Sequence, residues 1–166
     1  MELEISFEDP WFETTDLADL AQASVVAAQC VAPELANPRL VTSLLFTGDR
    51  AIHVLNREWR QRDKPTNVLS FPMLARSELL ALERDGPPIM LGDIALAKET
   101  VWVEAQGKSV TVEDHIAHLV IHGLLHLAGY DHVQSDKEAE AMEALETHAL
   151  AKMDIADPYG GRDFKE

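Results

Sequence analysis

The 166-residue sequence is poor in cysteine and has no long apolar run. Its one cysteine, Cys30, can form neither a disulfide framework nor a cysteine-based zinc module, and we expect it to be a small buried residue. No segment approaches the roughly 18 consecutive apolar residues of a membrane span. The first ten residues, MELEISFEDP, lack the basic start and apolar stretch of a signal peptide. These absences predict a cytoplasmic protein with no membrane partner.

Basic residues are also scarce. Lys and Arg total 14 against 29 Asp and Glu, which gives a formal net charge of −15. Indiscriminate binding to DNA, RNA or an anionic membrane requires an excess of basic residues near the ligand, so the composition excludes it and we expect no DNA partner. A nucleic-acid role needs a local basic patch, and residues 57–64 supply one with a net charge of +2. Its charged residues are Arg57, Glu58, Arg60, Arg62, Asp63 and Lys64.

The length and the 46% apolar content fit one folded domain over residues 1–166. Apolar alternation and β-rich runs predict strands at 3–7, 40–47, 68–71 and 91–96, and helical spacing predicts about five helices between and after them. The elements are grouped rather than strictly alternating. The sequence therefore predicts an α+β fold, a small mixed sheet covered by helices. Residues 76–88, charged and containing Gly86-Pro87-Pro88, are expected to form a mobile excursion.

One predicted helix, within residues 113–132 (EDHIAHLVIHGLLHLAGYDH), carries a row of histidines. At about 100° per residue, His115, His118, His122 and His126 fall within a stripe about 80° wide. The remaining sides of the helix are apolar, which is typical of a helix buried at the centre of a protein. Thr111 and Ser135 are predicted to cap this helix and the last one, whose acidic face is expected to be solvated.

The spacing of these histidines predicts a metal site. His122 and His126, at i and i+4, can direct ring nitrogens at one ion. Gly129 stands where a helix C-terminal glycine would turn the chain back, so that His132 can approach as a third ligand. Three neutral nitrogens and a fourth position open to water fit one Zn²⁺ per chain best, although Ni²⁺ and Cu²⁺ also bind such sets. His115 and His118 are expected to be surface residues, core polar contacts or partners of the ligands.

Position 123 holds glycine, where a His-Glu-x-x-His zinc peptidase would carry its general base, so peptidase chemistry is disfavoured. The nearest carboxylates are assigned other roles. We expect Asp114 to serve the helix N-terminus and Asp131 to hold the turn or a ligand ring.

Three blocks together resemble the YbeY family of bacterial rRNA maturation factors, which are single-strand-specific metallo-endoribonucleases. They are DKPTNVLSFP at 63–72, LGDI at 91–94 and HGLLHLAGYDH at 122–132. The resemblance covers most of the chain beyond Leu40. It implies a zinc-metallohydrolase-like fold, zinc ligated by His122, His126 and His132, and a functional arginine at Arg60. It also implies 16S rRNA maturation, ribosome quality control and contact with the small ribosomal subunit and its assembly factors. At position 67, where many members carry Asp, this chain has Asn.

The leading hypothesis is a zinc-dependent endoribonuclease that cuts single-stranded RNA with His122, His126, His132 and Arg60. Arg60 is always protonated and can grip two phosphate oxygens at once. Whether water or the RNA 2′-hydroxyl attacks is left open. Two other hypotheses remain: a non-catalytic ribosome-assembly factor with a structural zinc, and a metallohydrolase of small substrates.

Overall fold

The structure is a computed structural model that describes residues 1–11, 16–131 and 135–160. Its strands are β1 (Glu2–Phe7), β2 (Leu40–Thr47), β3 (Val68–Pro72) and β4 (Ile89–Ala97). Its helices are α1 (Leu17–Val31), α2 (Asp49–Arg60), α3 (Arg76–Leu80), α4 (Lys98–Lys108), α5 (Val112–Leu127) and α6 (Asp136–Ala151), and a short 3-10 helix, η1, spans Pro33–Ala36. The predicted α+β class is confirmed, and the described residues form six α-helices rather than about five.

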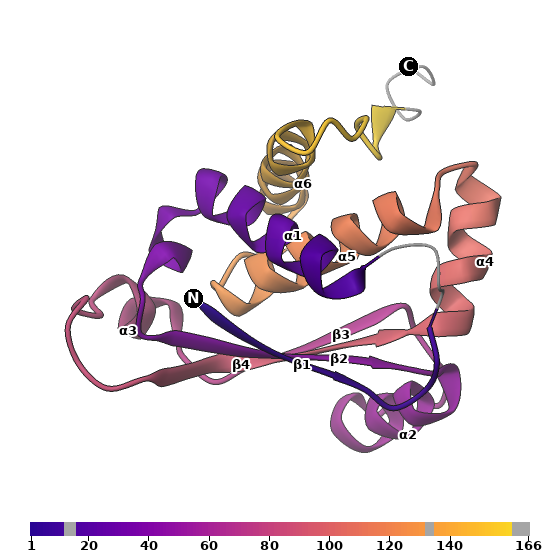
Figure 1. Cartoon of the computed structure of the whole chain (residues 1–166), viewed down its shortest axis with the longest axis horizontal. Coiled ribbons are helices and arrows are strands. Elements are labelled where there is room, and N and C mark those ends of the chain that lie inside the picture. The colour runs from indigo at the N-terminus through magenta and orange to yellow at the C-terminus, as the bar shows by residue number, and fades with distance from the viewer. Residues whose placement is uncertain (12–15, 132–134, 161–166) are drawn as a thin grey trace.

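The four strands form one mixed sheet in the order β1-β2-β4-β3. β1, β2 and β4 run parallel, and β3 is an edge strand antiparallel to β4. Helices α1, α5 and α6 lie on one side of this sheet, whereas α2 lies on the other side near one end (Figure 1). The two faces of the sheet are therefore covered very unequally.

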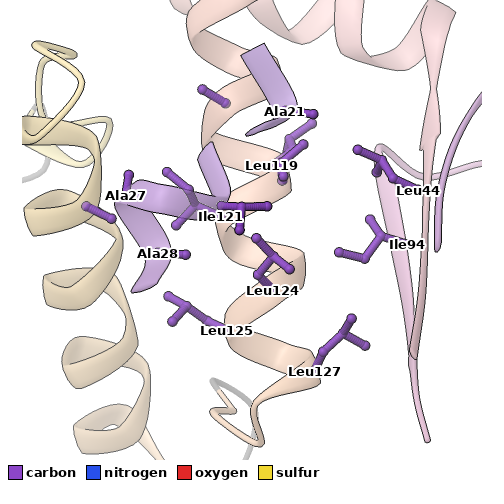
Figure 2. Packing of buried hydrophobic residues seen from close by; sticks show 14 of the residues in the cluster. Ala21, Ala27, Ala28, Leu44, Ile94, Leu119, Ile121, Leu124, Leu125 and Leu127 are labelled. Carbon is purple, nitrogen blue, oxygen red and sulfur yellow. The ribbon is translucent and has the colours of Figure 1, made fainter. Parts of the chain in front are cut away.

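The main core is built around α5, the predicted histidine helix. Leu44 of β2 and Ile94 of β4 point toward it from the sheet, while Ala27 and Ala28 of α1 lie on its other side (Figure 2). Nearly every α5 residue from His115 onward is buried, because the helix is apolar around most of its circumference. The prediction of a buried central helix is confirmed.

Gly123 allows α5 to approach the sheet closely. A Cβ atom at this position would lie 3.0 Å from Cδ1 of the buried Ile94, tighter than ordinary packing. Glycine at position 123, which disfavours a zinc peptidase, is thus explained by packing. A larger side chain would not fit between α5 and β4 without displacing Ile94.

The predicted caps are present. The Thr111 hydroxyl accepts a hydrogen bond from the Asp114 amide at 3.1 Å, and the Ser135 hydroxyl accepts one from the Glu138 amide at 3.1 Å. Each satisfies a backbone donor that the first turn of a helix leaves without a partner.

Two expectations are wrong. Residues 76–88 are not a free excursion: they begin with α3, bury Leu79, and are tied to Arg39, which donates to the carbonyls of Glu83 (3.1 Å) and Pro87 (3.0 Å). Cys30 is exposed rather than buried, because the buried face of α1 runs through residues such as Ala21 and Ala28 instead.

Among the described helices, none combines the length and the apolar character needed to cross a membrane.

Candidate metal and phosphate site

The histidines of α5 form one continuous row, as their spacing predicts. Ring centroids are 6.0 Å apart for His115 and His118, 6.5 Å for His118 and His122, and 4.5 Å for His122 and His126. The first two rings are buried, and His122 and His126 are partly exposed at the C-terminal end of the row. The accessible end of the row is therefore the pair predicted to bind metal.

The Nε2 atoms of His122 and His126 lie 3.1 Å apart, and each ring is fixed by an acceptor at its other nitrogen. Nδ1 of His122 is 2.6 Å from Oε1 of Glu146, and Nδ1 of His126 is 3.0 Å from the carbonyl oxygen of Tyr130. Because a carboxylate and a carbonyl only accept, the Nδ1 atoms carry the ring protons when the imidazoles are neutral. Each Nε2 then presents a lone pair on the same side of α5.

Glu146 is the centre of a buried polar cluster. Its side chain, from α6, is only 1% exposed and contacts His122, His118 (3.3 Å) and the Tyr159 hydroxyl, which donates to it at 3.0 Å. Burial raises the pKa of Glu146, but the hydrogen bonds from His118 and His122 outweigh this and lower the pKa to about 2. Glu146 is therefore an anion at neutral pH and a full acceptor for the His122 ring.

The turn after α5 supplies the acceptor for His126. Gly129 adopts φ 99°, the Tyr130 amide donates to the Leu125 carbonyl, and the Gly129 amide donates to the His126 carbonyl. This is the Schellman arrangement that ends a helix with a glycine in a conformation other residues avoid. The predicted end of the helix at Gly129 is confirmed, whereas the approach of His132 lies outside the described residues.

An arginine clamps this turn from outside. Arg76 donates to the Ala128 carbonyl at 2.6 Å and to Glu34 at 3.1 Å, and its guanidinium lies 4.4 Å from the centre of the Tyr130 ring. The Tyr130 hydroxyl donates to Glu34 at 2.9 Å. Residues from η1, α3 and the turn thus hold Tyr130 in place, and with it the carbonyl that fixes His126.

The residues present fit a tetrahedral metal ion. Two nitrogens each about 2.0–2.1 Å from one zinc ion lie about 3.3 Å apart, close to the observed separation. His132, the predicted third ligand, lies outside the described residues. The described part therefore contains two of the three predicted donors, and within 1–11, 16–131 and 135–160 no group of three or more possible ligands occurs.

Arg60 borders the same cavity as the two histidines. This cavity has a volume of about 630 Å³, and β3, the end of α2 and the turn after α5 surround it. Arg60, from the last turn of α2, donates through Nη2 to the Ser70 carbonyl at 2.7 Å, which holds the guanidinium against β3. The structure therefore brings Arg60 together with His122 and His126, although more than 60 residues separate them in the sequence.

The other predicted residues are placed as follows. Asp114 lies in the first turn of α5, and Asp131 lines the cavity. His115 is a core polar contact, 2.8 Å from Oε1 of Glu104. Asn67 donates to the same carboxylate oxygen at 2.9 Å, a bond that an ionised Asp at this position could not make.

The chain is similar to known proteins over most of its length. The family model described as Endoribonuclease YbeY matches residues 6–154. A protein from Erythrobacter litoralis named Endoribonuclease YbeY is 59% identical over 162 residues, 98% of this chain and 99% of that protein. A protein of the same name from Novosphingobium aromaticivorans is 52% identical over 162 residues, 97% of each chain.

The chain belongs to the endoribonuclease YbeY family. A solved structure agrees in fold: the solution structure of TM1509 from Thermotoga maritima superposes with a TM-score of 0.58 at 22% identity, covering 98% of this chain and 93% of that one. At this identity the likeness concerns the fold alone. The resemblance read from the three sequence blocks is confirmed at the level of the YbeY family.

Sequence reasoning missed two residues of this site. The acidic face of the last helix was expected to be solvated, and Glu146 was not singled out; it lies on the buried side of α6 with Met142, Ala149 and Leu150. A carboxylate at helical spacing among those apolar residues was the available signal. Tyr130 contributes a backbone carbonyl, which no side-chain pattern reveals.

Proposed function

We propose that this chain, a single domain over residues 1–166, is a zinc-dependent endoribonuclease that cuts single-stranded RNA during 16S rRNA maturation. Membership of the endoribonuclease YbeY family makes it a hydrolase that acts on RNA. The proposal adds the metal, the residues, the cytoplasm as the place of action, and contact with the small ribosomal subunit and its assembly factors.

The observation that carries the proposal is the shared cavity of His122, His126 and Arg60. Cleavage of a phosphodiester builds negative charge on oxygen, and this cavity offers a guanidinium beside two convergent imidazole nitrogens. His132 is proposed as the third ligand because Gly129 ends α5 and Asp131, the residue before His132, lines the same cavity as the pair.

Each residue has a distinct task. Arg60 would bind the non-bridging oxygens of the phosphate, using the N–H groups not engaged by the Ser70 carbonyl. His122, His126 and His132 would hold the cation, which when bound supplies Lewis-acid stabilisation of the phosphoryl oxygen and lowers the pKa of water. Glu146 and the Tyr130 carbonyl would keep both rings in the tautomer that presents Nε2.

A coupled metal and cleavage assay tests this proposal. Wild type, His126→Ala and Arg60→Ala are measured for bound zinc and for cutting of a labelled single-stranded RNA. We expect His126→Ala to lose both zinc and cleavage, and Arg60→Ala to keep zinc while losing at least about 100-fold in cleavage rate. Cleavage by rigorously metal-free wild type would overturn the metal role.

Matched controls come from the same elements. His148, exposed on α6, and Arg50, exposed in the first turn of α2, are each replaced by Ala, and both variants should bind zinc and cleave as wild type does. Full RNA cleavage by Arg60→Ala, with loss of ribosome association only, would favour the assembly-factor hypothesis instead.

A further inference from the structure

A second cavity lies on the other side of β3, on the sheet face against which α2 lies (Figure 1). Its volume is about 730 Å³, and Leu45, Leu55 and Ala95 form its apolar wall. Trp59, Phe71 and Met73 also line it, with Trp59 67% and Met73 56% exposed. We call this cavity the α2 groove. A binding pocket for a nucleotide-sized ligand has this size and character.

The α2 groove adjoins the candidate active site across the edge strand β3. Arg60, Ser70 and Pro72 line both cavities, so the edge strand β3 alone separates the groove from the histidine pair. The Arg60 guanidinium lies 5.7 Å from the centre of the Phe71 ring and donates to the Ser70 carbonyl. A strand whose phosphate sits at Arg60 therefore has the groove within reach of its neighbouring base.

The groove is suited to a base and not to a phosphate. Asp93 lines it beside Ser43, its register partner on β2, and a carboxylate repels an anion but accepts from the amino group of a base. Trp59 and Phe71 stand edge to face with ring centroids 6.4 Å apart, which leaves aromatic surface for stacking. Arg60 borders both cavities, and each has one carboxylate, Asp93 or Asp131, so the apolar and aromatic wall is what distinguishes the groove and suits it to an uncharged base.

We propose that the α2 groove binds an unpaired nucleobase next to the phosphate held at Arg60, with Trp59 as the stacking residue. The proposal rests on the proposed function and adds a basis for single-strand selectivity, because a base inside a duplex would first have to leave its pair and its stack, which costs free energy, before it could enter the groove. Trp59 is here a binding residue that takes no part in bond cleavage.

The test measures RNA binding without cleavage, in chelator-treated full-length protein. The probes are a short fluorescein-labelled oligoadenosine and an abasic ribose-phosphate strand of equal length. We expect Trp59→Ala to bind oligoadenosine about 5- to 150-fold more weakly than wild type, and to bind the abasic strand equally well. Trp59→Phe should recover most of the loss, and Trp102→Ala, which removes a tryptophan 46% exposed on α4, should bind both probes as wild type does.

Two kinds of result, one from the binding assay and one from sedimentation, would overturn the proposal. One is wild-type affinity of Trp59→Ala for oligoadenosine, or an equal loss for both probes. The other is self-association of wild type, measured by sedimentation, that Trp59→Ala abolishes while RNA affinity is unchanged; the groove would then bind a second copy of the chain. Failure of the proposed function is separate, since it is read from metal content and cleavage in His126→Ala.

Discussion

Nδ1 of His122 lies 2.6 Å from Oε1 of Glu146, a carboxylate delivered from α6 to the far side of a candidate metal ligand on α5. The pair joins two helices through the interior, and Glu146 is 1% exposed. A buried anion of this kind fixes the ring's orientation and increases the electron density at Nε2. Helix α6, whose acidic face was expected only to be solvated, therefore also positions a candidate metal ligand through Glu146.

Replacing Glu146 by Gln should weaken metal binding. The amide keeps the shape of the side chain but removes the charge that holds the His122 proton on Nδ1. We expect zinc affinity to fall about 10- to 100-fold, measured by competition with a chromophoric chelator. Glu140→Gln, on the exposed side of the same helix, is the control and should bind zinc as wild type does. Equal affinity for both variants would mean that Glu146 has only a structural role.

Replacing Arg76 by Ala should loosen the turn after α5. The change leaves the Ala128 carbonyl and Glu34 without a cationic donor, and we expect a loss of about 1–3 kcal/mol in the free energy of unfolding by urea. Zinc affinity should fall as well, because the Tyr130 carbonyl fixes His126. If the variant is destabilised but binds zinc with unchanged affinity, the contacts of Arg76 stabilise the fold without positioning His126.

Two glycines should respond oppositely to alanine. Gly107 in α4 has nothing within 4 Å of an added Cβ, so Gly107→Ala should stabilise the protein by about 0.5–1 kcal/mol. At Gly123 the new Cβ meets the buried Ile94, so Gly123→Ala should destabilise it by about 1–3 kcal/mol in urea unfolding. Adding Ile94→Val to Gly123→Ala should recover part of that loss; a stabilised Gly123→Ala variant would show that β4 yields readily.

Glu104 should give the protein an acid-sensitive contribution to stability. Burial raises the pKa of Glu104, but hydrogen bonds from His115 and Asn67 and the charge of Lys108 outweigh it and hold the pKa below 4.5. A lowered folded-state pKa means stability present above the unfolded value and lost as pH falls through the folded value. The side chain is 34% exposed, so we expect less than about 1 kcal/mol.

The measurement for Glu104 is the difference in unfolding free energy between wild type and Glu104→Gln across pH. It should be constant near neutrality and shrink once the pH falls below about 4.5. A difference that grows on acidification would contradict the assignment.

Sequence alone determined the parts of the site that lie close together along the chain. The stripe of four histidines follows from helical period, the turn at Gly129 from the need for positive φ, and the buried position of α5 from its apolar circumference. The four strands and the α+β class follow from short-range patterns in the same way. Arg60 was singled out by family resemblance and a local excess of positive charge.

The tertiary structure decided what no local pattern contains. Packing of α6 against α5 buried Glu146, one of many acidic residues, against a histidine. The order β1-β2-β4-β3 placed β3 at the edge, so that Arg60 borders a cavity on each face of the sheet. The helical period fixes the direction in which a side chain points from the helix axis. The partners of that side chain depend on how distant segments pack, and this packing is determined by the burial of apolar surface over the whole chain.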